Sequence, residues 1–125
     1  MKNLIIDTAG EKIFLKIIFE NKEYNIKVDN SRENFDRLVK IIFNFLDENN
    51  ISLSKNDNIF VNQGPGKYSS IRSAISISKG LKISRKINLY GFYSDQIIND
   101  NYDILMKLLE QGRLTKDFIQ PKYSD

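Results

Sequence analysis

Apolar and polar residues alternate along the first thirty positions, which is typical of β-strands with one buried face. Residues 4–6 predict a short strand that ends at the turn-rich segment 7–10. Residues 13–19 and 24–28 predict a second and a third strand, joined by a tight turn at 20–22. The apolar positions of these two strands are Ile13, Leu15, Ile17, Phe19, Tyr24, Ile26 and Val28. The chain is therefore expected to open with a three-stranded antiparallel meander.

After residue 30 the apolar period becomes that of a helix. Ser31 is a good N-cap, so one helix is expected from Arg32 to about Asn49. Its apolar arc is wider than contact with a single sheet requires. We assign the core-facing line to Val39, Ile42 and Leu46, and the surplus line beside it, as a partner or dimer interface, to Leu38, Ile41 and Phe45.

Strands and helices alternate in the rest of the chain. Residues 58–62 and 87–92 predict strands, residues 69–83 predict a helix, and residues 101–111 predict a last helix that ends at Gly112. The order β-β-β-α-β-α-β-α predicts an α/β fold. In it, parallel strands with crossover helices extend the antiparallel meander.

Composition limits the chemistry that the chain can perform. Its 125 residues suit one domain, and they include no cysteine and no histidine. The commonest general base and the commonest metal ligands are therefore missing, so we assign no catalytic residue, metal or cofactor. No apolar run is long enough to span a membrane, which favours the cytoplasm. The net charge of +3, with lysines scattered among acids, permits nucleic-acid contact without demanding it.

The segment NQGPGKYSSIR at 62–72 places a glycine-rich bend between a strand and a helix. Such a bend can bind anions at the helix N-terminus. However, its sequence is neither a P-loop nor a dinucleotide fingerprint, and Pro65 lacks a backbone donor. The favoured interpretation is a structural turn in which Gly64 and Gly66 supply unusual dihedrals and close approach, with Ser69 as a helix cap.

The helix after this bend is rich in small residues. Ile71 and Ile75 predict its core line, and a flat face lies beside them, formed by Ser73, Ala74, Ile77 and Gly80. A face of this kind allows another backbone to approach closely. The residues leave two interpretations open, which are close packing within the domain and contact with a partner helix.

Residues 51–81, ISLSKNDNIFVNQGPGKYSSIRSAISISKGL, resemble a segment of the TsaB family. The matching positions are Ser52, Leu53, Ser54, Asp57, Ile59, Val61, Gly64, Pro65, Gly66, Tyr68, Arg72, Lys79, Gly80 and Leu81. Asp7 and Thr8 resemble the turn after the family's first strand, and Pro121 and Tyr123 resemble its tail. The chain departs from the family pattern at Ser70, where the family has glycine, and at Ala74, where small residues alternate.

The resemblance implies an actin-like, RNase H-like single domain. Residues 1–95 would form the family's N-terminal lobe, and residues 96–125 would be the closing helix and tail of a second lobe that is mostly missing. Asp7 and Thr8 would then be a vestigial phosphate loop, and Arg72 would belong to the strand–helix turn.

The same resemblance implies a non-catalytic subunit of the complex that makes threonylcarbamoyladenosine in tRNA. Its expected partner is a TsaD-like protein, bound through helices of the first lobe, with a TsaE-like ATPase as a further partner. Contact with tRNA is expected to be only indirect, and a homodimer is expected in isolation. The alternatives are a small anion- or nucleotide-binding domain and a self-associating remnant.

Overall fold

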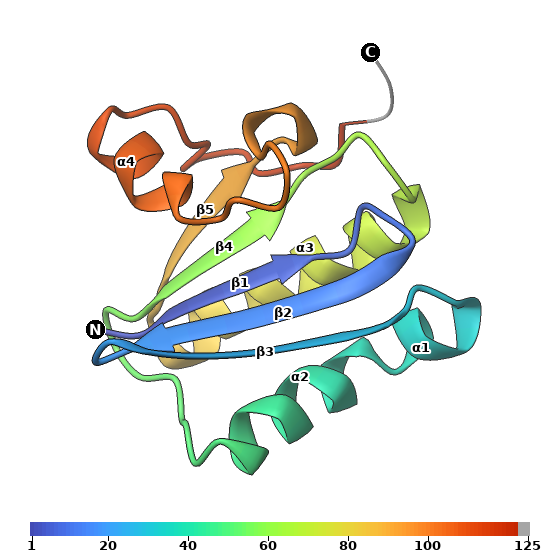
Figure 1. The fold of residues 1–125 in the computed structure, drawn as a ribbon, viewed down its shortest axis with the longest axis horizontal. Helices are drawn as coiled ribbons and strands as arrows, with labels where there is room; N and C mark the ends of the chain where they lie inside the picture. Colours follow the sequence, from blue (N-terminus) through green and yellow to red (C-terminus); the bar gives the residue numbers. More distant parts are fainter. Residues whose placement is uncertain (123–125) are drawn as a thin grey trace.

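Five strands form one mixed sheet in the order β3-β2-β1-β4-β5 in the computed structural model, which describes residues 1–122 (Figure 1). The strands are β1 (Asn3–Asp7), β2 (Lys12–Phe19), β3 (Lys22–Asp29), β4 (Asn58–Asn62) and β5 (Asn88–Phe92). The first three pair antiparallel, whereas β4 is parallel to β1 and to β5. This arrangement confirms the predicted meander with added parallel strands. Tyr123 lies outside the described residues.

The β2–β3 hairpin turns through two residues, Glu20 and Asn21, with φ of 53° and 63°. Two successive positive φ angles define the turn whose twist matches that of the flanking strands. The turn also fixes the register of the hairpin. As predicted, Ile13, Leu15 and Ile17 of β2 all point into the core, each with 0% exposure.

The single helix expected after residue 31 is two helices, α1 (Arg32–Asp36) and α2 (Leu38–Glu48). Ser31 caps α1 as predicted, since its hydroxyl accepts a hydrogen bond from the Asn34 amide. The helices are separated at Arg37, whose φ of −108° and ψ of 19° are not helical. Because of this break, Phe35 of α1 and the apolar residues of α2 do not lie along one continuous helical face.

The predicted core line of α2 is therefore wrong in part. Leu38 and Phe45 are 1% and 2% exposed and belong to the core, whereas Val39 is 51% exposed. Ile41 is half-buried. The predicted line assumes one unbroken helix from Arg32, whereas the structure has a break at Arg37. The observed core line runs through Leu38, Ile42, Phe45 and Leu46. Leu38 and Phe45 are thus covered by the chain itself and do not form a surface for a partner.

The remaining helices are α3 (Tyr68–Arg85), the short 3-10 helix η1 (Ser94–Gln96) and α4 (Ile104–Glu110). The core line of α3 through Ile71 and Ile75 is confirmed. Ser69 is not its cap, because the helix begins at Tyr68 and Lys67 occupies the cap position. The last helix ends before Gly112, whose φ of 67° stops it as predicted.

Helices cover both faces of the sheet (Figure 1). On one face, α2 and α3 pack on the larger core, which contains the inward residues Leu4, Ile6, Ile59 and Val61. On the other face, α4 contributes Leu105 and Leu108 to a smaller aromatic cluster. That cluster also holds Ile5, Phe60, Phe92 and Tyr102. Residues from beyond position 95 therefore share a core with the first lobe, while the division of the chain at residue 95 stays a prediction.

Candidate functional site

Polar side chains gather where the parallel strands β1 and β4 end. Asp7 is the last residue of β1 and Asn62 is the last residue of β4. The Asn62 amide nitrogen donates a 3.0 Å hydrogen bond to Asp7 Oδ1, and Asn62 Oδ1 accepts one of 2.7 Å from the Gly64 backbone. Carboxyl ends of neighbouring parallel strands are the usual place for a site in such sheets. This edge is therefore the first candidate site.

Both oxygens of Asp7 already have partners within the chain. Asp7 Oδ1 also accepts a 3.1 Å hydrogen bond from the Ala9 backbone amide, which caps the turn after β1. Asp7 Oδ2 accepts a 2.6 Å hydrogen bond from the Tyr102 hydroxyl. Burial raises the pKa of the Tyr102 phenol, and the neighbouring Asp7 carboxylate raises it further. Tyr102 thus remains a proton donor to Asp7 at neutral pH.

The two glycines of the bend are needed for different reasons, Gly64 for its backbone conformation and Gly66 for the lack of space for a side chain. Gly64 has a φ of +99°, in the region that side chains disfavour. Gly66 does not have such a φ, but a Cβ added to it would lie 2.3 Å from the Ala9 carbonyl oxygen. Close approach to the β1–β2 turn therefore requires glycine at position 66.

Two backbone donors of the bend are already in use. The Gly64 amide donates to Asn62, and the Lys67 amide donates to the Ala9 carbonyl at 2.9 Å. Pro65 has no amide hydrogen. A phosphate cradle needs free backbone donors, so these contacts support the structural interpretation of the bend. Binding of an anion at the bend stays untested.

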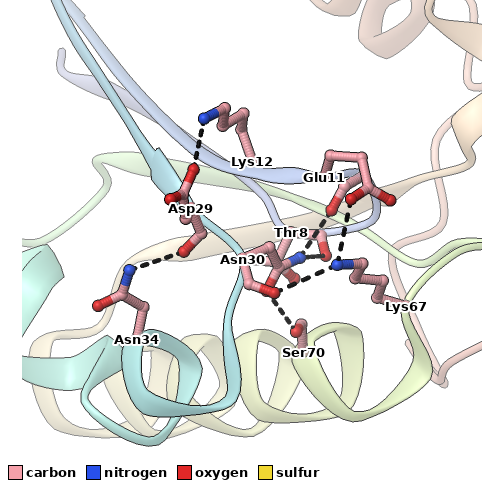
Figure 2. A network of polar contacts seen from close by, with 9 residues as sticks. Thr8, Glu11, Lys12, Asp29, Asn30, Asn34, Lys67 and Ser70 are labelled. Atoms are coloured by element: carbon pink, nitrogen blue, oxygen red, sulfur yellow. Dashed lines mark hydrogen bonds and ion pairs between the residues drawn. The ribbon is translucent and has the colours of Figure 1, made fainter.

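Asn30 joins three segments beside this bend (Figure 2). Its amide nitrogen donates to the Thr8 and Gly10 carbonyls at 2.7 and 2.8 Å. Its side-chain oxygen accepts a 2.6 Å hydrogen bond from Ser70 on α3. Lys67 contacts the Asn30 carbonyl and the Glu11 carboxylate (Figure 2). Ser70, where the family has glycine, therefore holds α3 against the end of β3.

Two shallow hollows, of about 230 and 280 Å³, flank the Asp7–Tyr102 pair. They share Asp7, Gly10, Asp100 and Tyr102, so the two hollows adjoin each other. Thr8 is fully buried and its hydroxyl has no hydrogen-bond partner among the described residues. Within residues 1–122, no group of three or more carboxylates is arranged to hold a metal ion. The two hollows therefore surround a carboxylate whose oxygens are already hydrogen-bonded within the chain.

A second candidate site is a groove between α1 and α3. Near α1 it is lined by Phe35, Asp36, Ser69, Arg72 and Ser73, and it encloses about 440 Å³. Farther along, Phe43 of α2 lies under the Arg85 guanidinium of α3, at 5.5 Å from the ring centroid. We define the α2–α3 face by Val39 and Phe43 of α2 and by Ser73, Ile77 and Gly80 of α3, of which Ser73 also lines this groove.

The predicted interface residues divide between this face and the core. Ser73 and Ile77 are half-buried and Gly80 is exposed, with nothing within 4 Å of an added Cβ. Ala74 is fully buried, and so are Leu38 and Phe45, so these three do not belong to the surface. Ile41 lies on the flank of α2 opposite Phe43, as helical spacing requires. Arg72 is exposed on α3 and not part of the bend itself.

Sequence reasoning missed Asn30, Asn62 and Tyr102. The first two follow or end predicted strands, so their position at strand ends was a usable signal. Tyr102 had no such signal, because its partner Asp7 is 95 positions away.

The sheet order, the crossover helices and the polar strand ends define an α/β domain of the actin-like, RNase H-like class. The structure of YeaZ from Pseudomonas aeruginosa superposes with a TM-score of 0.70 at 24% identity, covering 89% of this chain and 50% of that chain. RuvC from T. thermophilus, solved with a Holliday junction, gives a TM-score of 0.52 at 14% identity over 98% of this chain. These likenesses concern the fold alone.

Residues 21–98 match the family model described as TsaD: tRNA N6-adenosine threonylcarbamoyltransferase, and the chain therefore belongs to this family. Two curated relatives confirm its recognition as a TsaB-like, YeaZ-like member. Both are tRNA threonylcarbamoyladenosine biosynthesis proteins TsaB from Buchnera aphidicola, of subspecies Baizongia pistaciae and Schizaphis graminum. They are 26% and 25% identical over 80 and 95 residues, which is 64% and 76% of this chain. The alignments span only 36% and 45% of those relatives.

Proposed function

We propose that this chain is a non-catalytic subunit in the biosynthesis of threonylcarbamoyladenosine in tRNA, and that it binds a TsaD-like protein. Its family membership and its TsaB relatives support the pathway. The absence of histidine and cysteine from the sequence supports a role other than catalysis. A TsaE-like ATPase is a further proposed partner, and the cytoplasm is the proposed location.

The observation that carries the proposed partner contact is the α2–α3 face. Val39 of α2 is 51% exposed, and Phe43 of α2 and Ile77 of α3 are half-buried. Small residues at Ser73 and Gly80 leave space over α3 for a partner helix to approach closely. Burying such apolar side chains on association contributes about 25 cal/mol for each Å² removed from water. Two helices from a partner would complete a four-helix arrangement over this face.

A second copy of the chain presents the same face, so we propose that it forms a homodimer when the TsaD-like protein is absent. A two-fold axis would bring the two copies of the face together. The homodimer and the complex with a TsaD-like protein would then exclude each other. The assembly with the TsaD-like protein is the functional one.

The test is co-purification with the TsaD-like protein of the same organism. We expect Val39→Asp combined with Ile77→Asp to abolish complex formation and to leave a folded monomer. Because Ile77 is half-buried, Val39→Asp alone is measured in parallel, and circular dichroism verifies folding of both. The control is Ile98→Asp, at a side chain that is 70% exposed outside this face. If both Val39 variants stay folded and still bind, the α2–α3 face is not the interface.

A further inference from the structure

Positive charge is concentrated in the middle of the chain. Residues 58–94 contain no aspartate or glutamate but six basic residues, Lys67, Arg72, Lys79, Lys82, Arg85 and Lys86. Because the whole chain has a net charge of +3, the remaining residues have a net charge of −3. The expectation that lysines are scattered among acids is therefore wrong for this segment. α3 itself contains no acidic residue.

Part of this charge surrounds a groove between α3, β5 and the segment after α4. The groove encloses about 290 Å³, and its lining includes Lys79 and Lys82 of α3 and Lys116 and Phe118 of the later segment. Buried Leu89 and Ile119 form its apolar part. All three lysines are exposed, and none of them forms an ion pair within residues 1–122. Among the described residues, the lining of the groove has three lysines and a single carboxylate, that of Asp117.

Phe118 adds an aromatic surface to these cations. Its side chain is 88% exposed, although a phenyl ring gains free energy by burial. It follows Lys116 by two positions and has a positive φ of 56°. Cations beside an exposed aromatic ring are typical of proteins that bind single-stranded nucleic acid. In them phosphates contact lysines and an unpaired base stacks on the ring.

We infer that this groove binds a single-stranded segment of RNA, with phosphates on Lys79, Lys82 and Lys116 and one base stacked on Phe118. RNA is favoured over an acidic peptide because an exposed ring suits a base, and because the curated relatives are proteins of tRNA modification. A paired duplex does not offer free base faces to such a ring. This departs from the expectation that tRNA contact is only indirect.

The groove and the α2–α3 face lie on different flanks of α3. Lys79 and Lys82 line the groove with residues of β5 and the later segment, whereas Ser73 lines the groove toward α1. A partner on the α2–α3 face would therefore leave the RNA groove open. The inference goes beyond the proposed subunit function, but its choice of RNA rests in part on the same tRNA-modification relatives.

The experiment measures fluorescence anisotropy of a labelled oligoadenylate of about eight nucleotides, a length within the usual range for such sites. The purified chain is titrated at several salt concentrations. Three phosphate contacts predict a slope of about −2 for log K against log salt. Lys79→Glu with Lys82→Glu should weaken binding by about tenfold or more. The matched control, Lys22→Glu with Lys107→Glu, changes the net charge equally at exposed lysines outside the groove and should bind nearly as wild type.

Base stacking is tested separately with an oligonucleotide that has the same backbone without bases. Phe118→Ala should weaken binding of the complete oligonucleotide by about fivefold or more and leave the abasic one unaffected, whereas Phe118→Trp should retain binding. Equal losses in the two lysine pairs would overturn the inference, because net charge alone would then explain binding. Equally tight binding of poly-glutamate, with the same dependence on Phe118, would overturn it in favour of an acidic peptide.

Discussion

The Tyr102 hydroxyl donates a 2.6 Å hydrogen bond to Asp7 Oδ2, and the two residues are 95 positions apart. The same ring stacks on Phe14 of β2, with centroids 4.8 Å apart. One side chain thus joins the segment before α4 to the first two strands. The carboxylate at the end of β1 is thereby occupied by the chain's own tyrosine.

Tyr102→Phe should lower the free energy of unfolding by about 1–3 kcal/mol, because it removes a hydrogen bond to a charged group and keeps the ring stack. Urea denaturation at pH 7 measures the change. The pKa of Tyr102 is raised in the folded state, so its contribution is complete below the unfolded value near 10 and is lost as pH rises above it. Stability of the wild type should therefore fall more steeply above about pH 10 than that of the variant. Parallel curves for the two proteins would contradict this assignment.

Gly66→Ala and Gly80→Ala should change stability in opposite directions. An added Cβ at Gly66 would lie 2.3 Å from the Ala9 carbonyl oxygen, whereas at Gly80 it meets nothing within 4 Å. We expect a loss of about 1–3 kcal/mol for the first substitution. A gain of about 0.5–1 kcal/mol is expected for the second, since Gly80 lies inside a helix. Thermal and urea denaturation of both variants measure this difference, and a stable Gly66→Ala protein would show that the turn can shift.

Asp57→Asn should destabilise the protein by about 1–3 kcal/mol near neutral pH. Burial raises the pKa of Asp57, but hydrogen bonds from the Lys2 and Ser54 amides outweigh it and hold the pKa below the usual value. Those bonds are 2.9 and 2.8 Å long. A lowered pKa gives stability that is present above the unfolded value near 3.9 and is lost as pH falls through the folded value. The difference between wild type and variant should therefore shrink below about pH 4, and a difference independent of pH would exclude a role for the charge.

Leu38→Ala and Val39→Ala should distinguish the observed from the expected face of α2. Leu38 is 1% exposed, so its truncation should cost about 2–5 kcal/mol. Val39 is 51% exposed, and its truncation should change stability by no more than about 0.5 kcal/mol. Chemical denaturation of the pair provides the measurement. The reverse order of effects would mean that α2 is rotated about its axis.

The sequence by itself determined the strands and their order and the helical segments between them, except for the break that divides α1 from α2. Alternating apolar positions in β2 and the helical period in α3 are local properties, set by the two-residue and 3.6-residue repeats of the backbone. Ser31 capped α1 and Gly112 ended α4 for reasons contained within a few residues. Helix caps and helix ends of this kind can be predicted without knowing which residues lie nearby in the folded structure. The resemblance at residues 51–81 likewise depended only on residue order.

Only the tertiary structure decided which residues meet. The face of α2 that enters the core depended on the break at Arg37, which no apolar period reveals. The pairing of Asp7 with Tyr102 depended on α4 packing across the sheet. The grouping of Lys79, Lys82 and Phe118 required the later segment to reach α3. Such contacts join distant positions through the packing of the whole domain, so a local pattern does not encode them.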